Sequence, residues 1–322
     1  MATGQAESVD QRLLAYRPAP RTLGQTLSTF LDRPFFYIFP VIAVLLFLGV
    51  YPFVYNVRNS FREFDVVKGQ MESVGWANWE RLLHDDRFHG AILTTARYVG
   101  TALVLEFALG ISIALLLNSG PWLSGLWQSL LILPMVVPPT ITARMFGILM
   151  NSEFGAISWL LLKLDVIEKQ EPLLGGTGKH ALTAVMIPEI WQWTPFFVLI
   201  LLAGMKALPT EPLEAAMVDG ASTIQRFFHI TLPMLRPMIA VAVLFRLVDL
   251  LKAFDYVYIL TSGGPGTRTW LMSFDAYQRS FTTIEWGYGS VLALVILVFA
   301  ILLSNIYVRV FNVGWGNDDG SR

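Results

Sequence analysis

Residues 35–57 read FFYIFPVIAVLLFLGVYPFVYNV and contain no charged side chain. A bilayer core about 30 Å thick needs roughly 20 consecutive apolar residues per helix, so this stretch is long enough to span a membrane. The residues before it are polar and include Arg12, Arg17, Arg21 and Arg33. Because the apolar run is too long for a cleaved signal, we expect it to be an uncleaved anchor.

Five further apolar stretches follow along the chain. Hydrophobic residues make up 54% of the sequence and charged residues only 15%, compared with about 25% charged in soluble domains. The sequence therefore predicts an all-α, polytopic membrane bundle of six transmembrane helices in residues 35–311, between polar tails at residues 1–34 and 312–322. The six expected spans are residues 35–57, 91–117, 123–150, 181–205, 237–260 and 288–310.

Several function classes fit the sequence poorly. The absence of cysteine excludes disulfides and thiolate sites, and a net charge of -1 gives no basic footprint for nucleic acid. The four histidines lie outside the expected spans without metal-ligand spacing, so we expect no metal site and no catalytic centre, and an intramembrane enzyme is a weak alternative. Residues 175–180 lack the first glycine of a phosphate-binding loop. We expect no cofactor and no ATP site in this chain.

Residues 208–237, between the fourth and fifth spans, predict two short helices around a turn. Thr210 is placed to cap the first helix, and Pro212 lies in its first turn, where the missing N–H costs nothing. Gly220 follows Asp219 and suits the left-handed conformation that ends a helix.

The second short helix begins at Ser222, which forms a capping-box pattern with Gln225. We expect Pro233 and Pro237 to limit this helix. Its expected apolar face is Ile224, Phe227, Phe228 and Ile230. Periodicity alone indicates only an amphipathic connector.

The residue pattern of this loop is more specific than its periodicity. The sequence Glu214-Ala-Ala-x-x-Asp219-Gly220-Ala221 strongly resembles the EAA loop of ABC importer permeases. In that family the loop is a cytoplasmic coupling helix that docks on an ATPase. The coupling residues that the resemblance implies are Glu214, Ala215, Ala216, Asp219, Gly220, Ala221 and Phe227.

Further motifs look like the sugar-permease branch of that family, of the maltose and glycerol-phosphate type. They lie at residues 74–79, 134–139, 193–195, 202–209, 254–255 and 260–266. The resemblance implies a carbohydrate substrate delivered by an external solute-binding protein, a second and different permease chain, and two ATPase subunits that bind ATP and Mg²⁺. It also implies the prokaryotic inner membrane, with both termini cytoplasmic; the Lys and Arg counts of the two sides are nearly equal and do not decide orientation.

Ionisable side chains within the spans are costly, at about 2.5 to 3.5 kcal/mol each near the bilayer centre. They must therefore face a bundle interior, a partner subunit or water. They are Glu106, Arg144, Glu189, Arg246, Asp249, Lys252 and Asp255. We expect Glu106 and Arg144 to pair with each other or to meet the partner permease.

Two helical faces combine polar and aromatic groups in a way that suits a sugar. The fourth span carries Glu189, Gln192, Trp193 and Phe196, and the fifth carries Arg246, Asp249, Ala253 and Tyr256. We expect these faces to line the substrate path. Another interpretation stays open, in which Arg246 and Asp249 neutralise each other and Glu189 bonds to a neighbouring helix.

Two points stay open at the level of sequence. Pro134, Pro138 and Pro139 are consistent with either a bending gate or a plain kink in the third span. The alternative function is an ion-gradient-driven secondary transporter with Glu189 or Asp249 as the ion site, which would leave the EAA pattern unexplained and would favour internal repeats.

Overall fold

The computed structural model describes residues 34–120, 122–168 and 172–311. It divides the chain into two compact units between Tyr55 and Asn56, so the boundary falls inside the first described helix, α3 (Pro34–Asn59). Each unit is described by itself. The tails expected at residues 1–33 and 312–322 lie outside the described residues.

The first unit contributes most of α3. Every side chain from Ile38 to Tyr55 is exposed, and Phe47, Tyr51 and Tyr55 stack along one side at successive turns, with ring centroids 5.5 and 6.2 Å apart. A run of apolar helix in which every side chain is exposed is suited to lipid or to a partner helix rather than to water.

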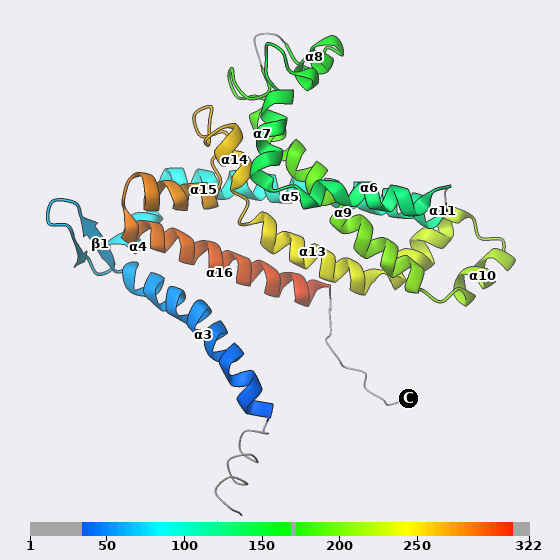
Figure 1. Cartoon of the computed structure of the whole chain (residues 1–322), viewed down its shortest axis with the longest axis horizontal. Helices are drawn as coiled ribbons and strands as arrows, with labels where there is room; N and C mark the ends of the chain where they lie inside the picture. The colour runs from blue at the N-terminus through cyan, green and yellow to red at the C-terminus, as the bar shows by residue number, and fades with distance from the viewer. Residues whose placement is uncertain (1–33, 121, 169–171, 312–322) are drawn as a thin grey trace, which may run out of the picture. The chain divides into compact units, whose positions relative to one another are not determined.

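Four long helices run side by side in the second unit (Figure 1). They are α5 (Asp86–Asn118), α9 (Ala181–Ala207), α13 (Arg236–Leu250) and α16 (Trp286–Val310). The helices α5 and α9 pack closely at Gly110, where a Cβ atom would collide with the Cβ of Phe197. Around this contact lies an apolar cluster that includes Ile111, Leu201 and Leu235.

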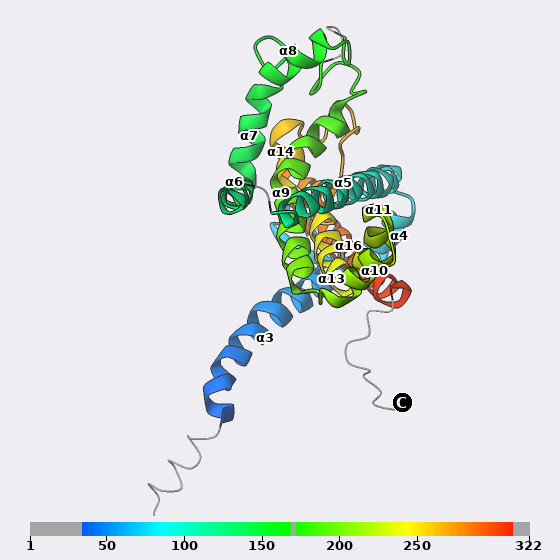
Figure 2. The same cartoon turned by 90° about the vertical axis from the view of Figure 1, so that its right-hand side faces the viewer.

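The expected third span, residues 123–150, is two helices rather than one. The helices α6 (Ser124–Val136) and α7 (Pro139–Leu149) meet at an angle of 96°. The break lies at Val137 and Pro138. Proline has no backbone N–H to donate to a helical hydrogen bond, and it disfavours the helical conformation in the residue before it. In both views α7 and α8 (Ala156–Lys163) extend away from the long helices (Figures 1 and 2).

The expected fifth span, residues 237–260, is also interrupted. The helix α13 ends at Leu250, and α14 (Asp255–Leu260) begins after a short irregular stretch. Before α13 the chain turns by 67° at Leu235. The loop before that turn contains α10 (Glu211–Val218), α11 (Thr223–Arg226), the π-helix η1 (Phe227–Thr231) and α12 (Leu232–Met234).

The all-α membrane fold is confirmed. The described residues include four helices that are long and apolar enough to cross a membrane, or up to six if each bent pair is one span. The pairs are α6 with α7, and residues 223–234 with α13. The predicted extents of the six-helix domain and its tails stay predictions.

A polar network holds the N-terminal end of α16. A hairpin of β1 (Arg62–Asp65) and β2 (Gln70–Ser73) precedes α4 (Ala77–Leu83), and α15 (Met272–Tyr277) with η2 (Gln278–Thr282) precedes α16. The Glu63 carboxylate accepts hydrogen bonds from the backbone N–H groups of Gly287 and Tyr288, at 3.3 and 3.1 Å. This places a negative charge at the positive end of the helix.

Candidate functional site

The turn after α10 has the predicted backbone. Gly220 has φ +78°, in the left-handed region that L-residues avoid, and Pro212 lies in the first turn of α10. The capping prediction for Thr210 is wrong: its side chain makes no cap hydrogen bond. Its backbone is helical, at φ -84° and ψ -25°, whereas a capping side chain normally extends from a residue in the β region.

The second short helix has the predicted start but not the predicted end. Ser222 Oγ accepts from the Gln225 N–H at 3.3 Å, and Gln225 Oε1 accepts from the Ser222 N–H at 2.8 Å, so the capping box is confirmed. The helical path continues through Pro233 to Met234. Pro233 and Pro237 do not limit it, because each lies in the first turn of a helical segment.

The surface of this loop is exposed and partly apolar. No residue of α10 is buried, and Met217 and Val218 are 51% and 89% exposed. Glu214, Ala215, Asp219 and Gly220 are exposed, while Ala216 and Ala221 are half-buried. Phe227 packs against the apolar cluster below the loop, and Ile224 and Phe228 stay exposed, so the expected apolar face is only partly covered.

A buried ion cluster joins three of the long helices. Arg246 on α13 makes two hydrogen bonds to the carboxylate of Glu106 on α5, at 2.7 and 2.8 Å. It also donates to Glu189 on α9 and to Asp249 one turn away. The Tyr98 hydroxyl donates to Glu189 at 2.7 Å. A single guanidinium therefore faces three carboxylates.

A second polar link closes the break between α6 and α7. Gln192 Nε2 donates to the backbone oxygen of Val137 at 2.6 Å. The N–H of Ile141 turns to Pro138 instead, so Val137 has lost its helical donor. The Tyr256 hydroxyl on α14 donates to Oε1 of Gln192. Gln192 thus connects both interrupted spans.

The family model that describes the inner membrane component of binding-protein-dependent transport systems matches residues 106–313. The chain belongs to this family. The trehalose/maltose transport system permease protein MalF of Thermococcus litoralis is 33% identical to this inner membrane component, over 85% of this chain and 91% of that protein. The sulfoquinovosyl glycerol transport system permease protein SmoG of Agrobacterium fabrum is 30% identical, over 84% and 87% of the two chains.

Solved structures support the fold of this inner membrane component. A chain of a bacterial ABC transporter involved in the import of the acidic polysaccharide alginate aligns with a TM-score of 0.75, at 19% identity, over 90% of this chain and 100% of that one. A chain of the alginate transporter in complex with a periplasmic protein bound to alginate pentasaccharide gives a TM-score of 0.72 at 20% identity, over 89% and 98%.

The predicted substrate faces of the inner membrane component are only partly accessible. Glu189, Gln192, Arg246 and Tyr256 are at most 3% exposed. The Asp249 side chain is 50% exposed, and Trp193, Phe196 and Ala253 are half-buried. Trp193 lies beneath Arg246, 4.7 Å from guanidinium carbon to ring centroid.

The fifth span does not present its four residues on one continuous face. Helical periodicity holds from Arg246 to Asp249 and is lost at the irregular residues 251–254, so Ala253 lies in the break and Tyr256 on α14. The sequence also allowed the interpretation that Arg246 and Asp249 neutralise each other and that Glu189 bonds to a neighbouring helix. The structure contains both contacts.

The predicted pairing of Glu106 with Arg144 is wrong. Glu106 is fully buried and pairs with Arg246, whereas Arg144 is exposed and makes no ion pair within the described residues. Sequence reasoning also missed Tyr98 and the role of Val137. No local pattern identifies these contacts, because Glu106 is 140 positions from Arg246 and Tyr98 is 91 from Glu189.

Proposed function

We propose that this chain is the permease subunit of an ATP-driven importer and carries a carbohydrate across the inner membrane. The support is the family membership together with relatives whose names specify trehalose, maltose and sulfoquinovosyl glycerol systems. The match to the trehalose/maltose permease protein covers 85% of this chain and 91% of that protein. The substrate is a saccharide or a glycoside, and the chain itself performs no catalysis.

Delivery in this proposal depends on an external solute-binding protein and a second permease chain. The family description names binding-protein-dependent transport, and the related alginate importer was solved with a periplasmic protein holding its pentasaccharide. The exposed apolar surfaces of α3 and α6 are suited to the partner permease or to lipid. Arg144, exposed on α7, is a candidate contact with that partner.

Energy enters through the loop that contains α10 and α11. We assign docking of a separate ATPase, which binds ATP and Mg²⁺, to Glu214, Ala215, Ala216 and the turn at Gly220. The exposed α10 supports this assignment, because Met217 and Val218 are apolar residues that would be covered by a partner. Two ATPase subunits, one for each permease chain, complete the assembly.

Alternating access would expose the buried polar groups. Glu189, Gln192 and Tyr256 contact a solute only if α9 separates from α13 and α14, whereas Asp249 and Trp193 are reachable in the present arrangement. The breaks at residues 137–138 and 251–254 support bending at these points, since irregular backbone at membrane depth is tolerated where it lines a cavity or is buried in protein.

The proposal also fixes the topology. Docking of the loop on a cytoplasmic ATPase places residues 206–237 in the cytoplasm. With six spans in residues 35–311, both tails are then cytoplasmic as well.

A pair of glycine substitutions tests the proposal in the reconstituted importer. Gly220 and Gly120 both have positive φ, at +78° and +73°, and a Cβ atom at either would meet nothing within 4 Å. Each change to alanine costs roughly 1–2 kcal/mol of backbone strain. We expect Gly220→Ala to reduce ATP-dependent sugar uptake and ATPase stimulation, and Gly120→Ala to leave both near wild type.

Two results would contradict this assignment. Equal effects of the two substitutions would show that strain, and not coupling, causes any loss. Uptake that needs no ATPase and collapses when the proton gradient is removed would replace the importer with the secondary transporter.

A further inference from the structure

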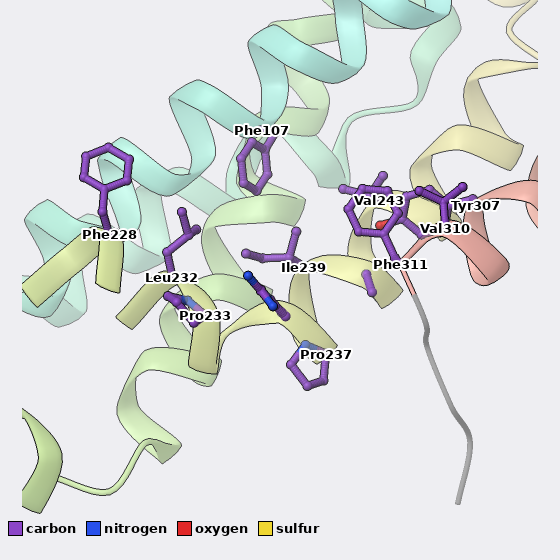
Figure 3. A pocket seen from close by; sticks show the side chains of 12 residues that line it. Phe107, Phe228, Leu232, Pro233, Pro237, Ile239, Val243, Tyr307, Val310 and Phe311 are labelled. Atoms are coloured by element: carbon purple, nitrogen blue, oxygen red, sulfur yellow. The ribbon is translucent and has the colours of Figure 1, made fainter. Parts of the chain in front are cut away.

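A groove of about 880 Å³ opens between α5, α13, α16 and the end of the loop helix, by which we mean the helical path of α11, η1 and α12 at residues 223–234 (Figure 3). Ligand pockets are commonly roughly 300–1,000 Å³, so the groove is large enough for a ligand. Phe107 contributes from α5, and Phe228 and Leu232 from the loop helix. Val243 on α13 and Val310 on α16 face the other end (Figure 3).

The lining is apolar except for two groups. Arg236 brings a cation, and the Tyr307 hydroxyl is buried without a hydrogen-bond partner in the described part of the chain. Arg236 is exposed and makes no ion pair among the described residues. None of the lining residues is acidic. The groove therefore combines a long apolar wall with one positive charge that lacks a counter-ion.

The position of the cation matters because the groove lies at one end of the spans. Arg236 is the first residue of α13, and the exposed Arg309 lies in the last turn of α16. Both arginines are thus at helix ends, where long basic side chains reach the membrane interface. Basic pockets between helices at such an interface suit anionic lipid headgroups.

We propose that this groove binds an anionic phospholipid of the surrounding bilayer, with an acyl chain along Phe107, Ile239 and Val243 and the headgroup phosphate on Arg236. The apolar wall covers the acyl chain, and the phosphate supplies the missing counter-charge. A neutral partner helix would cover the wall but leave the cation unpaired. This inference does not depend on which solute the protein carries.

Occupancy would act on the loop helix. Phe228, Leu232 and Pro233 line the groove and belong to the helical path that leads from Gly220 to the turn at Leu235. A lipid in the groove therefore contacts the helical segment that directly follows the residues to which the proposed function assigns ATPase docking. We expect anionic lipid to support coupling as well as binding.

The test uses the absence of cysteine from the chain, which allows a single label. Val310 lines the groove and is 72% exposed, whereas Ile306, one turn earlier on α16, is 56% exposed and is not a lining residue. Val310→Cys and Ile306→Cys, each labelled with bimane, are reconstituted with co-purifying subunits into vesicles. Doxyl-labelled phosphatidylglycerol or phosphatidylcholine then serves as quencher.

We expect phosphatidylglycerol to quench the label at position 310 more strongly than phosphatidylcholine, with little preference at position 306. Arg236→Gln should lower the preference about five-fold, the equivalent of one basic residue near the surface. Arg236→Lys should retain most of it, and Arg97→Gln, an exposed arginine elsewhere on α5, should leave it unchanged. Val243→Phe, which narrows the groove, should reduce quenching by both lipids.

Three outcomes would overturn the inference. Equal quenching by the two lipids would show an ordinary lipid contact, and no quenching by either would show that protein covers the groove. Loss of the preference in excess inorganic phosphate would identify a free-anion site. None of these readouts depends on transport, so failure of the proposed import function would leave this test intact.

Discussion

The Gln192 side-chain amide replaces a lost helical hydrogen bond by donating to the backbone oxygen of Val137, at 2.6 Å. The same side chain accepts from Tyr256. The interrupted third and fifth spans are therefore held together by one residue of the fourth, and both of its hydrogen bonds lie in a region from which water is largely excluded.

Gln192→Leu should destabilise the protein. The change leaves the Val137 carbonyl and the Tyr256 hydroxyl without partners, at about 1–3 kcal/mol for each buried unsatisfied group. The measurement is the midpoint of thermal unfolding in detergent. Gln128→Leu, the same change on α6 where no hydrogen bond of the side chain is found in the described residues, is the control and should lie close to wild type. Equal midpoints for the two variants would contradict the role of Gln192.

The ion cluster predicts that removing its single cation costs more stability than removing one of its carboxylates. Arg246→Met leaves the buried carboxylates of Glu106 and Glu189 without their cation, so the cost should approach the upper end of the roughly 3–5 kcal/mol seen when buried pairs are broken. Glu106→Gln leaves Arg246 with two carboxylates and should cost less. Unfolding midpoints compare the two, with Asp249→Asn, whose side chain is 50% exposed, as the mildest change. A larger loss in Glu106→Gln than in Arg246→Met would refute this account.

The close approach of α5 and α9 predicts opposite effects at two glycines of one helix. Gly110→Ala should destabilise by about 1–3 kcal/mol through overpacking against Phe197. Gly100→Ala meets nothing within 4 Å and should be neutral or stabilising by up to roughly 1 kcal/mol, because alanine loses less backbone entropy. The measurement is the thermal unfolding of both variants under the same conditions. A Gly110→Ala protein as stable as Gly100→Ala would mean that the helices separate at little cost.

Two carboxylates outside the spans should give opposite pH dependences. Burial alone would raise the pKa of Asp85, but hydrogen bonds from Tyr288 and Phe88 and the charge of Arg279 outweigh it, and the pKa lies below its ordinary value of 3.8. Because the folded-state pKa is lowered, the stabilisation is present above about pH 4 and is lost as the pH falls through the lowered value. Asp85→Asn should therefore have a lower midpoint of thermal unfolding than wild type at neutral pH. The difference between the two midpoints should become smaller in acid.

Asp275 should behave in the opposite way. Burial raises the pKa of Asp275, and the negative charge of Asp85 raises it further. Trp270, Arg279 and Arg87 lower the pKa, but they offset the effect of burial only in part. The folded state then keeps a proton that the unfolded state has already released, so stability falls as the pH rises above about 4. Asp275→Asn should remove the fall in stability in the range above about pH 4. A difference in unfolding midpoint between wild type and Asp275→Asn that stays constant across this range would contradict the raised pKa of Asp275.

The sequence by itself determined the membrane class, the apolar helices, the capping box at Ser222 and the left-handed turn at Gly220. These features depend on local physics: the length of an apolar run, the side-chain oxygen beside a helix start, and the freedom of glycine at positive φ. The resemblance of residues 214–221 to the loop of a known family added the membership that the family model confirms.

Only the tertiary structure decided the partners of the buried charges. The sequence led us to expect Arg144 or the partner permease beside Glu106, and only the packing of α5 against α13 shows that its cation is Arg246. The prolines mark the third span as a place for a kink already in the sequence, but the group that satisfies the freed backbone at the break is visible only in three dimensions. Gln192 supplies that hydrogen bond to Val137 from 55 positions away, a distance over which helical periodicity carries no information.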